Sequence, residues 1–253
     1  MKKIFSIYPF NDEDFKNQMN VIKNSLFDGV FIYQSDAYEE QLQVCKEMDI
    51  FVEAIHVLRN KADSLWNDDD YEVYKSTVMN GIYMASKYKT KLVVMHLTSF
   101  KTKEKNERGL NRMKEFVEYA TKMDVILCLE NVRNNEHFDY VLDSINSDHL
   151  KRCFDVGHAN CFSKDLYSEY HLKNIERVVC VHLHDNNGLY DEHKIPFTGS
   201  IDFEWFVEKF MKIKNQINIT FEVHNQRMYY DTFKELVDNS SIAVKRIEEL
   251  FKR

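Results

Sequence analysis

The sequence predicts a single (β/α)8 barrel. Eight short runs rich in β-branched and aromatic residues alternate with longer amphipathic segments along the whole 253-residue chain. Run interiors such as LVVM at 92–95 and VILCL at 125–129 are continuously apolar, which is typical of parallel strands covered on both faces. Eight such units in about 250 residues favour a closed barrel, and a doubly wound open sheet is the alternative.

The expected strands are short, and each is followed by a helical segment. The strands lie at 3–8 (KIFSIY), 29–33 (GVFIY), 50–56 (IFVEAIH), 91–96 (KLVVMH), 124–130 (DVILCLE), 151–155 (KRCFD), 177–182 (RVVCVH) and 218–223 (NITFEV). The clearest helices, with apolar residues near three-and-four spacing, lie at 36–48, 69–88, 107–123, 203–214 and 230–250. The charged segment 101–108 is expected to be a solvated loop. Because these units use the full length, one domain over residues 1–253 is expected.

Composition excludes several classes of protein. No apolar run is long enough for a transmembrane helix, and the amino-terminal segment is a poor signal peptide. The five cysteines are odd in number and lack a CxxC pair, which predicts reduced thiols in a cytoplasmic protein. The net charge of −7 gives no electrostatic footprint for duplex DNA.

Histidines and carboxylates stand at or just after six successive expected strands, from the third to the eighth. They are His56, His96, Glu130, Asp155, His158, His182, Asp191, His193 and Glu222. The carboxyl ends of barrel strands meet at one rim, so these side chains are expected to be neighbours. Clustered carboxylates repel each other, and mixed His, Asp and Glu ligands suit zinc, manganese or cobalt. The sequence therefore predicts a divalent metal site, with more than one ion as an option.

Each of these residues taken alone has a simpler interpretation. His56 is by itself more typical of a hydrogen-bonded core residue, Glu130 can pair with Arg133, and Asp155 can cap the next helix. All such interpretations would have to hold at every strand from three to eight. The metal site is the better explanation of the whole set.

Four motifs resemble the xylose isomerase-like barrel superfamily. They are LENV (129–132), FDVGHAN (154–160), VHLHDNNG (181–188) and DEHKIPFTGSIDF (191–203). This superfamily holds sugar and sugar-phosphate isomerases and epimerases, and also abasic-site endonucleases of the endonuclease IV class. The resemblance is carried mainly by residues 90–225.

The resemblance implies a metal-dependent isomerase or epimerase of a sugar or sugar phosphate. Its metal ligands would be Glu130, Asp155, His182 and Glu222. Glu130 and Glu222 would also exchange a carbon-bound proton through a metal-stabilised enediolate, with His158 as a further catalytic residue. His184 and Arg227 are expected to contact the substrate. His184 stands where many relatives have a lysine, and PFTGSIDF lacks the first glycine of the usual GxG.

The endonuclease-like pattern is the alternative, because His56, His96, His158, Asp191 and His193 complete the set that holds three zinc ions in that class. Against it, the expected rim loops are acidic, as in YPFNDEDF (8–15) and YQSDAYEE (33–40). The rim carboxylates are Asp12, Glu13, Asp14, Asp36, Glu39, Asp68, Asp69 and Asp70. We therefore expect a small sugar or polyol as substrate, and neither nucleic acid nor membrane as partner. A non-catalytic sugar-binding barrel and a homo-oligomer are both left open.

Overall fold

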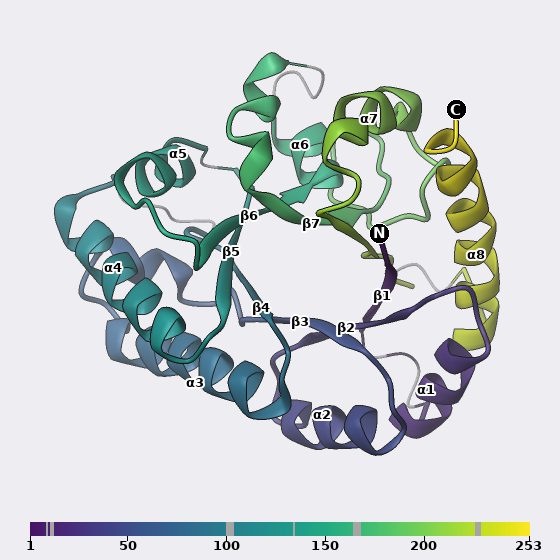
Figure 1. Ribbon diagram of the computed structural model, residues 1–253, viewed down its shortest axis with the longest axis horizontal. Helices are drawn as coiled ribbons and strands as arrows, with labels where there is room; N and C mark the ends of the chain where they lie inside the picture. Colours follow the sequence, from purple (N-terminus) through teal and green to yellow (C-terminus); the bar gives the residue numbers. More distant parts are fainter. Residues whose placement is uncertain (9, 11–12, 100–103, 134, 164–167, 226–228) are drawn as a thin grey trace.

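The eight strands close into one parallel barrel in sequence order, as the computed structural model shows (Figure 1). The structure describes all residues except 9, 11–12, 100–103, 134, 164–167 and 226–228. The predicted (β/α)8 barrel is confirmed, and the open-sheet alternative is wrong because β1 pairs with β8. The strands are β1 (Lys3–Ile7), β2 (Gly29–Tyr33), β3 (Val52–His56), β4 (Leu92–Met95), β5 (Ile126–Glu130), β6 (Leu150–Asp155), β7 (Val178–Leu183) and β8 (Asn218–Phe221).

A helix follows each strand and covers the outer face of the barrel (Figure 1). The helices are α1 (Phe15–Lys23), α2 (Tyr38–Glu47), α3 (Tyr71–Tyr88), α4 (Glu107–Lys122), α5 (Asn135–Ser144), α6 (Val156–Phe162), α7 (Phe203–Phe210) and α8 (Phe233–Leu250). Helix α3 begins two residues later than expected because Asp70 adopts a left-handed backbone with φ 59°, which a right-handed helix does not continue. The expected helix at 203–214 ends at Phe210 and passes into a 3₁₀ turn, Met211–Ile213.

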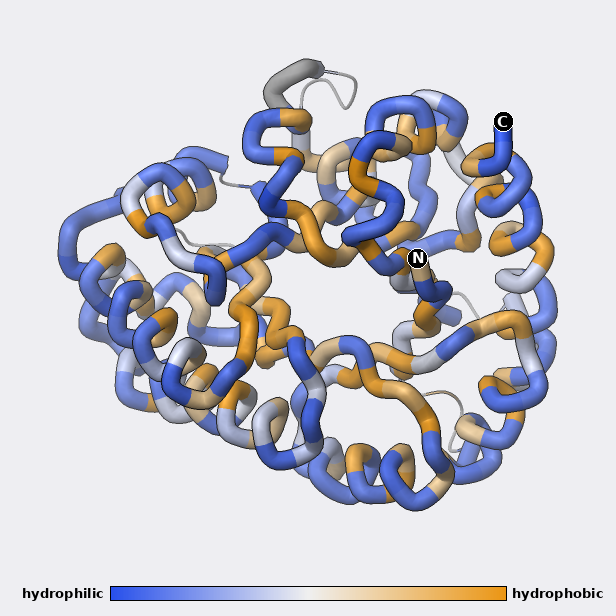
Figure 2. The backbone as a smooth tube through the Cα atoms, viewed as in Figure 1, coloured by the Kyte–Doolittle hydropathy of each residue, from blue (hydrophilic) through white to orange (hydrophobic). Residues whose placement is uncertain are grey.

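Two layers of hydrophobic residues hold this arrangement together. The larger lies between the strands and the helices, and Figure 2 shows hydrophobic residues along the strands and the inward faces of the helices. The smaller fills the barrel interior with Ile4, Phe31, Ala54, Leu92, Val94, Cys128, Cys153 and Cys180. All five cysteines of the chain are free in the structure. Within the described residues, no helix combines the length and the apolar character needed to cross a membrane.

Glu53 is a carboxylic acid inside the barrel. Its Oε2 accepts a hydrogen bond of 2.7 Å from Thr220 Oγ1. Because β3 and β8 are not neighbours in the sheet, this bond crosses the barrel interior. Burial, with a smaller contribution from Cys180, raises the pKa of Glu53 from its ordinary 4.5 to about 7. The folded protein therefore holds a proton on Glu53 that the unfolded chain releases at lower pH.

We expect this proton to make stability fall as the pH rises. Between about pH 4.5 and 7 the folded state binds more protons at Glu53 than the unfolded state does. The free energy of unfolding therefore falls by up to about 3 kcal/mol as the pH rises through this range. Glu53→Gln keeps the acceptor for Thr220 and removes the ionisation. Urea denaturation should show it more stable than the natural protein at pH 8, with little difference at pH 4.5. The exposed Glu72→Gln on α3 is the control, and a gain that does not change with pH would contradict this account.

Candidate functional site

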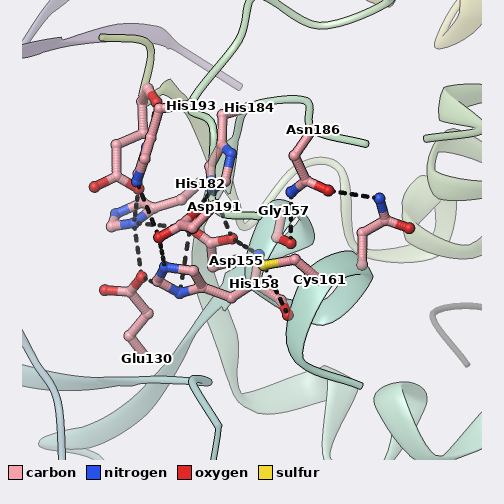
Figure 3. Close-up of polar contacts among 12 residues, drawn as sticks. Glu130, Asp155, Gly157, His158, Cys161, His182, His184, Asn186, Asp191 and His193 are labelled. Atoms are coloured by element: carbon pink, nitrogen blue, oxygen red, sulfur yellow. Dashed lines mark hydrogen bonds and ion pairs between the residues drawn. The ribbon is translucent and has the colours of Figure 1, made fainter. Parts of the chain in front are cut away.

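The nine predicted histidines and carboxylates lie together at the carboxyl end of the barrel. Figure 3 shows Glu130, Asp155, His158, His182, Asp191 and His193 directed toward one another. His56, Glu130 and Asp155 are the last residues of β3, β5 and β6, and His182 lies within β7. His96 and Glu222 directly follow β4 and β8, His158 lies in α6, and Asp191 and His193 lie in the loop between β7 and α7. The fold thus brings together residues that are spread over most of the chain.

The first group of candidate ligands consists of Glu130, Asp155, His182 and Glu222. Their ligand atoms all lie within 4.8 Å of one another. Nδ1 of His182 lies 3.5 Å from Glu130 Oε1, 3.8 Å from Asp155 Oδ2 and 3.1 Å from Glu222 Oε2. Four neighbouring strand ends therefore direct three carboxylates at one imidazole nitrogen.

The hydrogen bonding of this first group fits a metal ion. Glu130 Oε1, Asp155 Oδ2, Glu222 Oε2 and both ring nitrogens of His182 are buried and have no hydrogen-bond partner among the described residues. A buried polar atom without a partner costs about 1–3 kcal/mol, and more when it is charged. The second oxygens of two carboxylates are already used, since Asp155 Oδ1 accepts from the His158 N–H and Glu222 Oε1 accepts from the Tyr33 hydroxyl. The remaining oxygen and nitrogen atoms form a donor set that suits a divalent cation.

The second group contains His56, His96 and Glu130. Both imidazoles place Nε2 at 3.0 Å from Glu130 Oε2. Nδ1 of His56 lies 2.7 Å from the carbonyl oxygen of Val57, which can only accept, so this nitrogen carries the proton. In the neutral ring, Nε2 then presents a lone pair to a carboxylate oxygen, and that contact is favourable only with a cation or a second proton between them. Glu130 therefore belongs to both the first and the second group.

The third group contains His158, His184, Asp191 and His193. Nε2 of His158 and Nε2 of His193 lie 3.4 Å and 3.3 Å from Asp191 Oδ2. Their Nδ1 atoms lie 3.0 Å and 2.9 Å from the backbone carbonyls of Asn131 and Glu222, respectively. As in His56, these carbonyls orient the rings so that Nε2 faces the carboxylate, which is the usual outer support of a metal-binding histidine.

The electrostatics of the cluster favour bound positive charge. Burial acts to raise the pKa of Glu130, but the His96 and His182 imidazoles outweigh it and hold that pKa well below the ordinary value. Glu222 behaves in the same way beside His182 and His193. Burial lowers the pKa of His182, yet Glu222 and Glu130 raise it well above its usual range. The ionised carboxylates thus attract either protons or a metal to the same place.

Two further residues support the site and were not predicted. The hydroxyl of Tyr33 donates to Glu222, and burial together with that carboxylate raises the pKa of Tyr33 far above its usual value. Asn131 ties β5 to β6, because its amide donates to the Asp155 carbonyl at 2.8 Å and its oxygen accepts from the Asp155 N–H at 2.9 Å. Tyr33 ends an expected strand, so the strand-end argument identifies it once uncharged residues are included.

The remaining predicted residues differ in where they lie and in what they contact. Arg227 and Asp12 lie outside the described residues. His184, predicted as a substrate contact, is fully buried and belongs to the third group. The predicted capping by Asp155 is present at α6, but it uses only one carboxylate oxygen and leaves the other for the first group. Arg133 lies over the ring of Phe162 at 4.0 Å.

Residues 27–249 match the model of the xylose isomerase-like TIM barrel family, and the chain belongs to this family. The uncharacterized protein MJ1311 of Methanocaldococcus jannaschii is 31% identical over 158 residues, which cover 56% of this chain and 54% of that protein. The chain thus spans about half the length of this curated relative.

Solved structures share the fold over nearly the whole chain. D-psicose 3-epimerase with D-tagatose, from Clostridium cellulolyticum H10, is 15% identical, covers 99% of both chains and gives a TM-score of 0.78. The IOLI protein with a bound zinc atom is also 15% identical, covers 98% of both chains and gives a TM-score of 0.78. At this level of identity the likeness establishes the shared barrel.

Proposed function

We propose that the protein is a divalent-metal-dependent isomerase or epimerase of a sugar or sugar phosphate. One observation carries this proposal. Glu130 and Glu222, at strand ends separated by β6 and β7, each direct an unpartnered, buried carboxylate oxygen at His182. A proton-transfer enzyme needs two such groups within reach of one substrate carbon. The sugar epimerase found among the structures of the same fold supports the substrate class.

The residues of the first group have separable tasks. Glu130, Asp155, His182 and Glu222 would hold the ion, which when bound supplies Lewis-acid stabilisation of negative charge on the substrate oxygens. The lowered pKa of Glu130 and of Glu222 keeps both carboxylates ionised and able to accept a proton. One carboxylate accepts the carbon-bound proton and becomes neutral. The other takes up a proton from solvent and donates it to the same carbon, and the first then releases its proton to solvent.

Neighbouring side chains orient these two carboxylates. Tyr33 donates a hydrogen bond to Glu222 Oε1 and so fixes the orientation of this carboxylate, whose Oε2 has no partner among the described residues. The ring of His158 lies 3.0 Å from Glu130 Oε1 and stabilises its ionised form. These contacts favour the ionised forms of the Glu130 and Glu222 carboxylates, although both are buried.

Exchange of hydrogen with solvent tests the proposal directly. The metal-loaded protein is incubated in D₂O with a panel of ketopentoses, ketohexoses and their phosphates, and deuterium incorporation is followed by NMR. We expect slow exchange of the carbon-bound hydrogen of at least one sugar, lost on removal of the metal by a chelator. Absence of exchange with every sugar, together with rapid incision of an abasic duplex, would overturn the proposal.

Phosphodiester cleavage on abasic DNA is the second candidate, because the second and third groups add ligands next to the first. Neighbouring ions about 3.5–4 Å apart are typical of phosphoryl transfer. The rim is also less repulsive to phosphates than its acidic residues suggest. Asp68 pairs with Arg108 and Arg112, and Asp70 pairs with Lys61.

The abasic duplex in the same assay decides between the candidates. We expect no duplex binding at moderate ionic strength, because the net charge is −7. Binding that falls steeply with salt, with incision well above background, would favour the nuclease.

A further inference from the structure

We infer that a cavity between the β7–α7 loop and the segment after β8 binds an apolar or aromatic group carried by the sugar substrate. The inference rests on the proposed function and names its substrate more closely, as a glycoside with an apolar aglycone rather than a free sugar or a sugar phosphate. An aglycone blocks the anomeric carbon, so the carbonyl group that proton transfer requires would be a ketone elsewhere on the sugar ring.

The cavity is small and mainly apolar. Its volume is about 190 Å³, and the described residues that line it include Ile195, Thr198, His224, Tyr229, Tyr230 and Leu236. Sites that enclose a whole small molecule usually have volumes of about 300–1,000 Å³. The cavity therefore has room for part of a substrate, such as a single aromatic ring.

The mouth of the cavity is aromatic. Tyr229 lines the cavity and yet has 62% of its surface exposed. Leu189 and Tyr190, in the loop that also supplies Glu192 and Lys194 to the lining, are 73% and 67% exposed. These three are the most exposed large hydrophobic side chains in the part of the chain that the structure describes. Such exposure on two segments that line one cavity is typical of a ligand-binding site.

The charges at the cavity disfavour a phosphate group. Lys194 is the one lysine or arginine among the described residues of the lining, and its Nζ lies 2.9 Å from Glu192 Oε2. The Glu192 side chain is only 4% exposed, so a buried carboxylate offsets the charge of Lys194. A phosphate would be repelled by this carboxylate, whereas an apolar group gains from contact with the aromatic rings. The lining therefore favours an uncharged, apolar group.

His224 places the cavity next to the proposed reaction centre. Its ring lines the cavity, and its Nε2 lies 3.4 Å from the hydroxyl of Tyr33, which donates to Glu222. The ring also stacks on Tyr8 and on His193, with centroids 4.2 Å and 4.0 Å apart. One imidazole thus lies between the cavity and the Tyr33–Glu222 pair, so a substituent on a sugar held at the first group is within reach of the cavity.

The loop that forms one wall of the cavity is held by its own hydrogen bonds. Asp185 and Lys194 exchange two backbone hydrogen bonds, of 2.8 Å and 2.9 Å. The Asp185 carboxylate also accepts from the backbone N–H groups of Gly199 at 2.8 Å and Ile201 at 3.2 Å. The wall is therefore formed before a ligand binds, which reduces the entropy lost on binding.

Binding of paired glycosides tests the inference without turnover. The metal-loaded protein is titrated with the methyl and phenyl glycosides of the same hexoses and with the corresponding hexose phosphates, and Kd is measured by calorimetry. We expect at least one hexose whose phenyl glycoside binds about 10-fold more tightly than its methyl glycoside, because the phenyl ring is removed from water. Equal affinity for the methyl and phenyl glycosides of every hexose, or tighter binding of the phosphates, would overturn the inference.

Two variants locate the phenyl ring. Thr198→Phe fills the cavity and should abolish the preference for the phenyl glycoside, whereas Tyr229→Ser removes the ring at the mouth and should weaken it. Affinity for the methyl glycoside should not change in either variant. Tyr83→Ser, exposed on α3, is the matched control and should keep the preference. A preference that survives in both Thr198→Phe and Tyr229→Ser would place the phenyl ring elsewhere and contradict the inference.

The outcome is distinguishable from that of the proposed function. Deuterium exchange into a sugar, with no preference for phenyl glycosides, would refute the inference alone. A phenyl preference that is lost in Thr198→Phe, with no exchange into any free sugar or keto-glycoside, would refute the proposed reaction and retain the cavity as a site for an apolar group.

Discussion

Glutamine in place of Glu130 or Glu222 should lower kcat for hydrogen exchange by about 10²–10⁴-fold, the usual contribution of a general acid or base. Glutamine keeps the size and one oxygen of the side chain but cannot accept a proton from carbon. The loss should appear in kcat more than in KM, because the amide still fills the same space. Exchange of the sugar hydrogen in D₂O measures it.

The same samples must be analysed for metal, since both residues are also proposed ligands. Loss of exchange with the metal retained identifies proton transfer as the role, whereas loss of both identifies ligation. Glu13→Gln, on the same rim but outside the ligand groups, is the matched control and should exchange normally. Near-normal exchange in either Glu130→Gln or Glu222→Gln would contradict the proposed mechanism.

Substitutions of Asp155 should remove the metal of the first group. Asp155→Asn keeps an oxygen for the His158 N–H at the start of α6 but loses the charge that faces His182. Asp155→Ala loses both, so it should also lose about 1 kcal/mol of stability through the missing helix cap. Elemental analysis should show the metal loss in both variants, with exchange activity abolished in both.

Comparison of the two variants distinguishes the roles of the two carboxylate oxygens of Asp155, one in the helix cap and one in the proposed metal site. Urea denaturation in the presence of a chelator should find Asp155→Asn more stable than Asp155→Ala, because only the first keeps the cap. Full metal content in Asp155→Asn would show that Asp155 serves α6 alone and that the first group is wrongly assigned.

The barrel was predictable because short sequence patterns specify each of its strands and helices. Each strand is a short apolar run such as LVVM at 92–95, and the order of the strands follows the order of the runs. The convergence of Glu130, Asp155 and His182 was predictable for a related reason. Closing a parallel barrel brings the carboxyl ends of all strands to one rim, whatever their separation in sequence.

The remaining features depend on contacts between segments that no local pattern specifies. The position of His184 depends on the missing side chain of Gly157. Asn131 and Tyr33 carry no charge, and their roles arise only from their neighbours Asp155 and Glu222. The charge of Asp68 at the rim is likewise offset by Arg108 and Arg112 of α4, which pair with it in the structure.

Glu130 belongs to two of the candidate ligand groups, so metal binding at one group would affect metal binding at the other. Its Oε2 faces His56 and His96, and its Oε1 faces His182. An ion on one side withdraws negative charge from the other, and such coupling between two binding equilibria is reciprocal. The affinity of each group for an ion would then depend on whether the other group is occupied. A single dissociation constant would therefore not describe either group, and metal titrations call for a coupled two-site isotherm.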